Sequence, residues 1–223
     1  MITETLSRLN SELRPFGCRL IAVSKTQPVE KIREAYQAGQ RLFGENKVQE
    51  LVDKHEQLPA DIEWHLIGHL QRNKVKYIAP FVGLIHSVDS LRLLEEINKQ
   101  GEKNNRIIPC LLQIHIASEE TKFGFDRNEL MEALPEITKM NWVSIKGLMG
   151  MATFTDDKEK VRSEFKQLKN IFKDLKNIES GNIQMRELSM GMSGDYRIAL
   201  EEGSTLVRIG TTIFGERNYP VAS

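Results

Sequence analysis

The sequence is short of the features that mark several specialised classes of protein. It has only two cysteines in 223 residues, Cys18 and Cys110, and both border apolar runs. So few thiols argue against a disulfide framework or a cysteine-based metal site. They predict buried free cysteines in a reducing compartment instead.

Long hydrophobic runs are also missing. No stretch reaches the eighteen or so apolar residues that cross a membrane. The opening segment, MITETLSRLNSELR, is too polar for a signal peptide. The sequence therefore predicts a cytoplasmic protein with no membrane partner.

The sequence has no excess of charge of either sign. Lys and Arg total 31, Asp and Glu total 31, and the formal net charge is zero. Because a dedicated nucleic-acid-binding protein carries a basic excess, no nucleic-acid partner is expected. Neither a G-x-x-x-x-G-K-[ST] loop nor a G-x-G-x-x-G fingerprint occurs, so an ATPase or a Rossmann dehydrogenase lacks support.

What the sequence does contain is a regular alternation of short apolar runs with helical patterns. The predicted strands are 19–24, 41–44, 63–68, 83–86, 109–116, 144–150, 187–190 and 206–209. The predicted helices between them are 28–38, 47–56, 71–78, 91–99, 127–134, 157–176 and 195–201. Leucines at 6, 9 and 13 predict one more helix before the first strand.

Strands that alternate with helices pair in parallel, because parallel neighbours need a crossover helix. Two folds fit this pattern: an open, doubly wound sheet and a closed (β/α)8 barrel. Eight units in 223 residues favour the barrel as a single domain over residues 1–223. In either fold the functional residues are expected at the C-terminal ends of the strands.

The first such end, in LIAVSKTQP, carries Lys25, and Pro28 then suits the first position of a helix. A solvated lysine is the ordinary alternative. The last two strand ends, in SMGMSGD and RIGTT, are rich in small and hydroxyl residues that can cradle a phosphate. Tight turns and helix caps are the alternative for these two segments.

A lysine and a phosphate cup at one barrel mouth together suit a phosphorylated aldehyde or ketone. Lys25 would form a Schiff base, and the phosphate would anchor the ligand. Arg208, two residues before Gly210, either points at the same ligand or forms a structural ion pair.

The histidines are predicted to be structural. His65 and His69 lie four apart in a strand and its end, about 13 Å from each other, which is too far for a shared zinc ion. His115 is expected to be a hydrogen-bonded histidine of the barrel. The acidic pairs at 119–120 and 201–202 are expected on solvated faces.

Eight ordered segments resemble the pyridoxal 5′-phosphate (PLP) homeostasis proteins, the YggS/PROSC family. These segments are LIAVSKTQP, FGENKVQE, WHLIGHLQRNK, HSVDS, EETKFGF, GLMGMAT, LSMGMSGD and STLVRIGTTIFGER. The resemblance implies a single barrel similar to the N-terminal domain of alanine racemase, which is fold type III of PLP proteins. It also implies PLP binding for buffering or delivery, with PLP-dependent apoenzymes as partners and no established turnover.

The resemblance also implies roles for individual residues. It assigns the PLP Schiff base to Lys25, places Asn46 close to the cofactor, and turns Arg208 toward the pyridine nitrogen. The residues implied to hold the phosphate are Ser189, Gly210 and Thr211.

Three positions carry less certain implications. Lys122 matches a family lysine whose role is less settled, either a second contact for PLP or a contact for a partner. His69 stands where many members have proline, and Arg197 stands where an acidic residue is usual. Neither departure is expected to touch the cofactor residues.

Two other functions are open: a PLP-dependent amino-acid racemase from the same barrel class, and a class I aldolase that uses Lys25 without a cofactor. Racemases of this class use a second domain and a tyrosine of the partner subunit. Only about a dozen residues follow the last predicted strand, too few for such a domain. A noncatalytic carrier, monomeric or weakly dimeric, is therefore expected.

Overall fold

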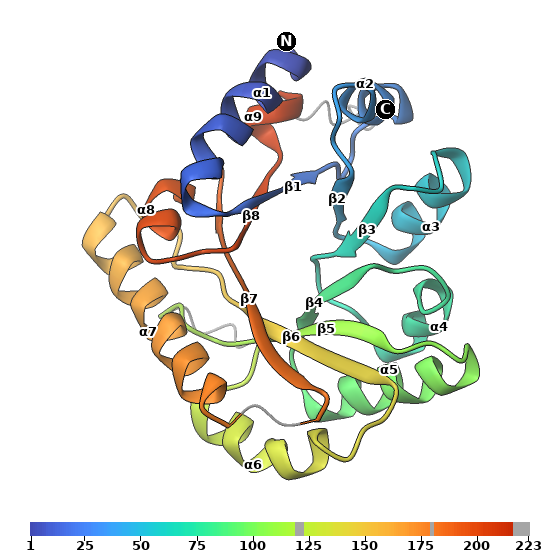
Figure 1. The fold of residues 1–223 in the computed structure, drawn as a ribbon, viewed down its shortest axis with the longest axis vertical. Coiled ribbons are helices and arrows are strands. Elements are labelled where there is room, and N and C mark those ends of the chain that lie inside the picture. The colour runs from blue at the N-terminus through green and yellow to red at the C-terminus, as the bar shows by residue number, and fades with distance from the viewer. Residues whose placement is uncertain (119–122, 179–180, 216–223) are drawn as a thin grey trace, which may run out of the picture.

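Eight parallel strands close into a barrel in the computed structural model, which describes residues 1–118, 123–178 and 181–215 (Figure 1). Each strand pairs with its neighbours in chain order, and β1 closes the ring by pairing with β8. The strands are β1 (Arg19–Val23), β2 (Leu42–Glu45), β3 (Glu63–Leu66), β4 (Leu84–Val88), β5 (Ile108–Gln113), β6 (Val143–Met149), β7 (Ile183–Met192) and β8 (Leu206–Ile209). The predicted (β/α)8 barrel is confirmed.

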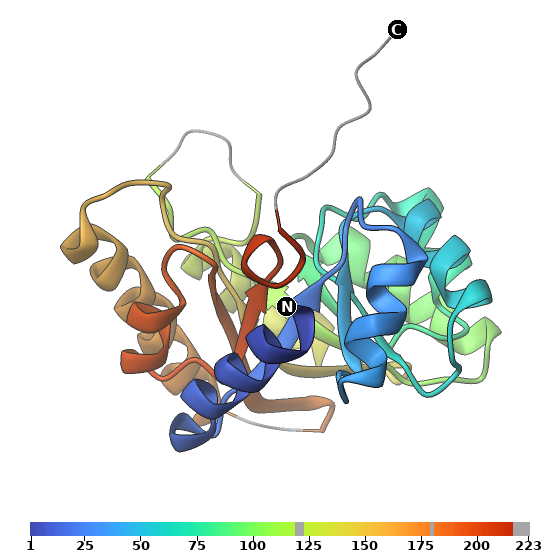
Figure 2. The same cartoon turned by 90° about the horizontal axis from the view of Figure 1, so that it is seen from above.

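The helices form the outer layer of the barrel (Figure 2). The α-helices are α1 (Ile2–Leu13), α2 (Val29–Gln37), α3 (Val48–Gln57), α4 (Val75–Ile78), α5 (Leu91–Lys103), α6 (Arg127–Ile137), α7 (Lys158–Lys176), α8 (Tyr196–Glu201) and α9 (Thr211–Phe214). Two short 3-10 helices are η1 (Arg14–Phe16) and η2 (Arg72–Lys74). Helix α1, predicted from its leucines, packs against α2, α9 and β1.

Beyond shifts of a few residues at other element ends, three differences from the sequence-based prediction stand out. The helix predicted over 71–78 is split into η2 and α4, and the short helix α9 was not predicted. Strand β7 runs from Ile183 to Met192, six residues longer than predicted, because Gln184 and Arg186 interrupt its apolar pattern. This longer strand changes which of its residues lie inside the barrel.

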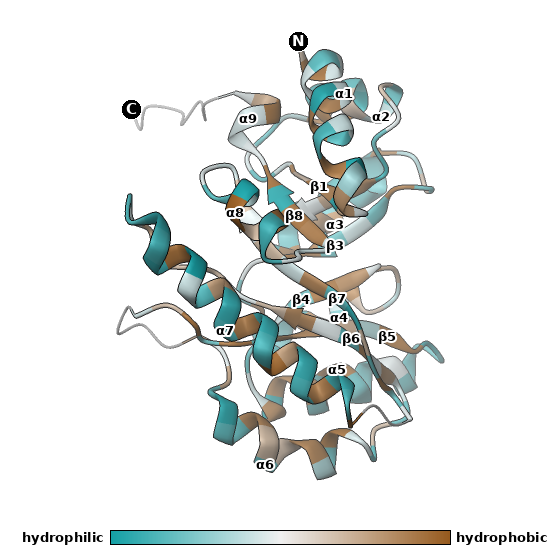
Figure 3. Ribbon diagram, turned by 60° about the vertical axis from the view of Figure 1, so that its left-hand side comes forward, coloured by the Kyte–Doolittle hydropathy of each residue, from teal (hydrophilic) through white to brown (hydrophobic). Residues whose placement is uncertain are grey.

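The core lies between the strands and the ring of helices, and a smaller cluster fills the barrel. Helix α7 shows the usual two-faced pattern, with its apolar stripe buried against the sheet (Figure 3). The small cluster inside the barrel consists of Ile21, Leu84, Leu111, Met149 and Leu206. These residues fill the barrel and leave its C-terminal mouth for a ligand.

Both cysteines are free and buried, as predicted. Burial raises the pKa of the Cys18 thiol to about 11 and also raises the pKa of the Cys110 thiol. Within the described ranges, no helix is long and apolar enough to span a bilayer.

Candidate functional site

A pocket of about 650 Å³ opens at the carboxyl ends of the strands. The loops that follow β1, β2, β3, β6, β7 and β8 all contribute to its wall. Five of the six residues predicted for the cofactor line it: Lys25, Asn46, Arg208, Gly210 and Thr211. The fold thus brings these five residues from three distant segments to one mouth.

Lys25 is half-buried in the turn between β1 and α2. The next residue, Thr26, has φ 63°, a left-handed conformation that is strained for a β-branched side chain. Its backbone N–H donates to Glu50 Oε1 at 2.6 Å. The turn therefore keeps an unfavourable backbone conformation because a carboxylate fixes it.

An ionic cluster lies behind this turn. Lys54 Nζ, on α3, donates to Glu45 Oε1 at 2.8 Å, and Ser24 Oγ donates to the same oxygen at 2.6 Å. Burial raises the pKa of the Glu45 carboxyl to about 7, against the opposing effect of Lys54. Glu45 Oε2 is buried and has no hydrogen-bond partner among the described residues. Glu45 is therefore a group that titrates near neutral pH in direct contact with the residue before Lys25.

Asn46 follows β2 and is held by a close approach of two backbones. A Cβ at Gly68 would lie 2.4 Å from the carbonyl oxygen of Asn46 and 2.7 Å from its Cα. Only glycine fits there, so Gly68 permits the loops after β2 and β3 to pack together beside the pocket.

Gly210 makes a similar approach on the other side of Lys25. A Cβ there would lie 2.9 Å from the carbonyl oxygen of Val23, the last residue of β1. Thr211 follows with an exposed side chain that lines the pocket. The ends of β8 and β1 are thereby adjacent, which brings a hydroxyl donor to the mouth that Lys25 lines.

Arg208 lies in β8 and is only 4% exposed, yet it lines the pocket. Its Nη1 donates to the carbonyl oxygen of Ser189 at 2.9 Å and to Ser189 Oγ at 2.5 Å, and its Nη2 donates to the carbonyl oxygen of Gly150 at 3.1 Å. Burial lowers the pKa of Arg208 to about 10, partly offset by Asp195, so the group remains charged at neutral pH. These bonds use three of its five N–H groups.

The prediction that Ser189 lines the phosphate cup is corrected by the structure. Ser189 is fully buried, and it is not among the residues of the pocket wall. Its hydroxyl contacts Arg208 Nη1 and, at 2.9 Å, His86 Nδ1. Because β7 continues to Met192, Ser189 lies inside the barrel, and Ser193 and Gly194 line the pocket in its place.

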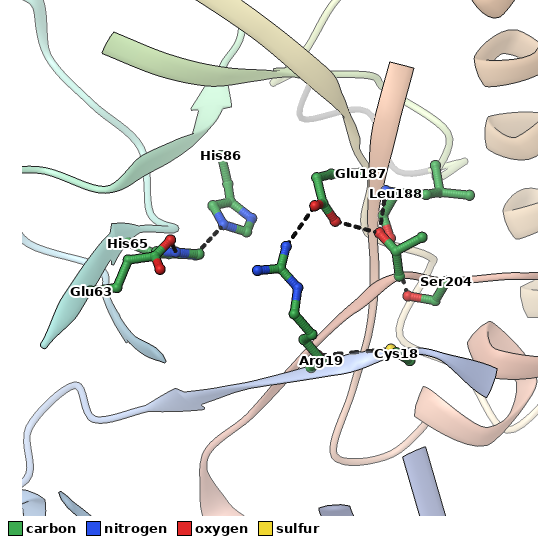
Figure 4. Close-up of polar contacts among 9 residues, drawn as sticks. Cys18, Arg19, Glu63, His65, His86, Glu187, Leu188 and Ser204 are labelled. Atoms are coloured by element: carbon green, nitrogen blue, oxygen red, sulfur yellow. Dashed lines mark hydrogen bonds and ion pairs between the residues drawn. The ribbon is translucent and has the colours of Figure 1, made fainter. Parts of the chain in front are cut away.

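Next to Arg208, a chain of hydrogen bonds runs through Ser189 and crosses the barrel interior. Figure 4 shows Glu63, His65 and His86 turned toward one another, with His65 Nδ1 3.0 Å from His86 Nε2 and His65 Nε2 2.9 Å from Glu63 Oε1. Burial holds the pKa of His86 well below its ordinary value. The bond from His65 holds the pKa of the Glu63 carboxyl below its ordinary value, so this carboxylate accepts at the far end of the chain.

Other predicted residues have varied positions. Among the described residues, no group of three or more histidine, cysteine and carboxylate side chains could hold a metal. His115 lies beyond the end of β5 and is half-buried. Arg197 contacts Glu12 at 3.5 Å, away from the pocket. Lys122 and the acidic pair at 119–120 lie outside the described residues.

His69 lines the same pocket as Lys25, contrary to expectation. Its Nδ1 lies 3.1 Å from Asp89 Oδ2, and its ring lies 5.0 Å from that of Phe123. His69, expected from the sequence to differ from the usual family residue, therefore lies at the mouth of the site. Three further exposed apolar side chains line the pocket: Met151, Phe154 and Met192.

The ionic cluster and this apolar rim were not predicted. The spacing of Glu50 and Lys54, four apart on one helix, is a usable signal for an ion pair. Nothing in the sequence indicates that the pair turns inward beneath Lys25, since that contact joins α3 to the loop after β1.

Comparisons with known proteins agree with this fold. The family model of the alanine racemase N-terminal domain matches residues 1–218, which defines the class of barrel. Alanine racemase from Bartonella henselae has the same fold at a TM-score of 0.73, with 18% identity over 97% of this chain and 58% of the racemase. Likeness at that level of identity concerns the fold alone.

Closer relatives define the family within that class. The pyridoxal phosphate homeostasis protein of Aquifex aeolicus (strain VF5) is 43% identical over 202 residues, 90% of this chain and 88% of the relative. The structure of PipY from Synechococcus elongatus PCC7942, with PLP bound, superposes at a TM-score of 0.89 and 38% identity, over 96% of this chain and 100% of PipY. The chain belongs to the family of pyridoxal phosphate homeostasis proteins.

Proposed function

We propose that this chain is a single barrel that binds PLP covalently through Lys25, and that it holds and delivers the cofactor in the cytoplasm without a turnover reaction of its own. The observation that carries the proposal is the convergence of Lys25, Arg208 and Thr211 on one pocket at the strand ends. Membership of the homeostasis family and the PLP-bound structure of PipY support it.

The residues of the pocket fit PLP in size and chemistry. A volume of about 650 Å³ suits a cofactor of this size. When bound, PLP supplies a reactive aldehyde and a phosphate dianion. The amine of Lys25 is the nucleophile for the aldehyde. The donors proposed for the phosphate are the Thr211 hydroxyl and the Ser193, Gly194 and Gly210 backbone.

Arg208 is proposed to face the pyridine nitrogen. A guanidinium donates hydrogen bonds and accepts none. Facing the ring nitrogen, it would keep that nitrogen unprotonated, so the ring would withdraw electrons weakly. This arrangement favours storage of the cofactor over chemistry on an amino acid.

The rim of the pocket supports delivery. Phe123, Met151 and Phe154 are 52%, 42% and 99% exposed, so the mouth is edged by apolar surface in contact with water. PLP-dependent apoenzymes are the proposed recipients, and the protein is proposed to act as a monomer or a weak dimer. An open mouth lets the cofactor leave.

The proposal is tested by trapping the bound cofactor. Borohydride reduction of the PLP-loaded protein should fix a phosphopyridoxyl group on Lys25, located by peptide mass spectrometry. Lys25→Ala should lose the visible absorption band and keep its far-UV spectrum, because a lysine in a turn contributes little to the core. An adduct found only on Lys47 or Lys122 would overturn the assignment.

The racemase and aldolase alternatives are separated by two further measurements. A cofactor-free aldolase is colourless, whereas a PLP-loaded protein absorbs in the visible. Two-base racemisation needs an acid or base on each face of the cofactor, and no tyrosine lines the pocket within the part of the chain that the structure describes. Incubation with L-alanine should therefore give neither sustained loss of chirality nor multiple turnovers of α-deuterium exchange.

A further inference from the structure

Lys54 is a buried lysine on α3 whose ammonium group is fully used by its neighbours. Its side chain is 6% exposed. Nζ donates to the carbonyl oxygen of Ser24 at 2.7 Å, to Glu45 Oε1 at 2.8 Å and to Glu50 Oε1 at 2.6 Å. An ammonium has three N–H donors, so none remains for a ligand.

These three contacts hold the residues on both sides of Lys25. Ser24, immediately before it, is bonded to Lys54 through its carbonyl and to Glu45 through its hydroxyl. Thr26, immediately after it, is bonded through its N–H to Glu50, which is itself bonded to Lys54. One ammonium therefore fixes the backbone of the turn upstream and downstream of Lys25.

The conformation of Thr26 indicates that this support is needed. Its φ of 63° is in the left-handed region, which a threonine adopts only when surrounding contacts impose it. The one side chain that bonds its N–H is Glu50, among the hydrogen bonds of the described residues. Without Lys54, the Ser24 carbonyl and the carboxyl groups of Glu45 and Glu50 would lose the donor that joins them beneath the turn, and the turn would relax.

We propose that Lys54 is a positioning residue that presets the Lys25 backbone for covalent capture of the cofactor. The inference rests on the proposed role of Lys25, and it identifies the group that holds the Lys25 backbone in place before the cofactor binds. Because the turn is ordered before binding, the ordering cost is not subtracted from cofactor affinity. Lys54 itself touches neither the pocket wall nor the cofactor.

The experiment compares two ligands that differ at one group. PLP carries the aldehyde that Lys25 captures, and pyridoxine 5′-phosphate carries an alcohol there and cannot be captured. In Lys54→Met, PLP binding should weaken at least tenfold and the visible band should form more slowly. Binding of pyridoxine 5′-phosphate should change less than threefold.

Two more variants control for lost stability. Arg106 is a partly buried cation away from the pocket that donates to the carbonyls of Ala79 and Val82, so Arg106→Met removes similar bonds from the scaffold. It should lower the Tm without changing the ratio of the two affinities. Glu50→Ala removes the bond to Thr26 and one of the three bonds of Lys54. It should show a smaller PLP-specific loss, and it is the second test variant if Lys54→Met does not fold.

The outcomes distinguish a failure of the positioning role of Lys54 from a failure of the proposed function. Equal weakening of both ligands in the foldable variants, or no weakening of PLP, overturns the positioning role while leaving Lys25 as the captured lysine. Failure of the wild-type protein to form a borohydride-fixed adduct at Lys25 overturns the proposed function, and the positioning role with it.

Discussion

Lys25 and Arg208, the lysine and the arginine that line the pocket in the described part of the chain, are supported in opposite ways. The turn that carries Lys25 rests on an ionic support made of Glu45, Glu50 and Lys54. Arg208 rests on a neutral support made of His86, Gly150 and Ser189. The two supports differ in whether the buried cation is paired with carboxylates.

In the ionic support, a buried cation is matched by carboxylates, and its charge is confined to the scaffold. Burying such a group is costly unless it is paired and hydrogen-bonded, as Lys54 is. In the neutral support, Arg208 is hydrogen-bonded without any ion pair among the described residues. The charge of Arg208 is therefore not neutralised by the protein. An anionic cofactor would be attracted to Arg208 and not to Lys54.

The largest effect should come from the mouth of the pocket, at Thr211. One lost hydrogen bond to a phosphate dianion costs on the order of 1.5–3 kcal/mol, so Thr211→Ala should weaken PLP binding by about 10- to 150-fold. Pyridoxal, which lacks the phosphate, should bind weakly and be indifferent to the change. Equilibrium titration by visible absorption measures both, and an equal loss for the two ligands would show that Thr211 supports the fold instead.

Ser189→Ala should remove the hydroxyl that joins Arg208 to His86 in the neutral support. It leaves His86 Nδ1 and one N–H of Arg208 without a partner in a buried site, so the free energy of unfolding should fall by about 1–3 kcal/mol. Affinities for PLP and pyridoxal should fall by the same factor, since Ser189 is buried away from the pocket wall. Urea unfolding and parallel titrations test this. A loss confined to PLP would restore Ser189 as a phosphate ligand.

The smallest effect should come from Glu45, and it depends on pH. Its carboxyl titrates near 4.5 in the unfolded chain and near 7 when buried, so the folded state holds a proton that the unfolded state releases between these values. The associated stability is complete below about pH 4.5 and is lost as the pH rises through 7.

Glu45→Gln should therefore flatten the decline in the free energy of unfolding by on the order of 1 kcal/mol between pH 5 and pH 7. Urea midpoints at pH 5, 6, 7 and 8 measure the slope for both proteins. Parallel slopes would mean that Glu45 stays ionised beside Lys54 throughout this range.

Much of the fold was predictable because parallel strands buried on both faces are short continuous apolar runs. The same rule explains the main error. In β7 the polar residues Gln184 and Arg186 hide the first half of the strand. The sequence thus showed that Ser189 lies near a strand end, but not that its side chain is enclosed by the barrel.

The site was predictable where chemistry and strand ends coincide, as at Lys25, Arg208 and Thr211. It was not predictable where the support comes from another element. Lys54 is distant in sequence from Ser24 and contacts it only because α3 packs behind the turn after β1. Likewise, His65 and His86 are joined to Arg208 through Ser189 only when the barrel brings together four strands, β3, β4, β7 and β8.

The burial of both cysteines has a consequence for a protein proposed to carry an aldehyde. Thiolates are strong nucleophiles, and their fraction falls as the thiol pKa rises. Cys110 is fully buried in β5, and Cys18 is only 7% exposed. A carrier built this way keeps its own sulfur out of reach of its cargo, so the lysine competes with no thiol of the folded chain.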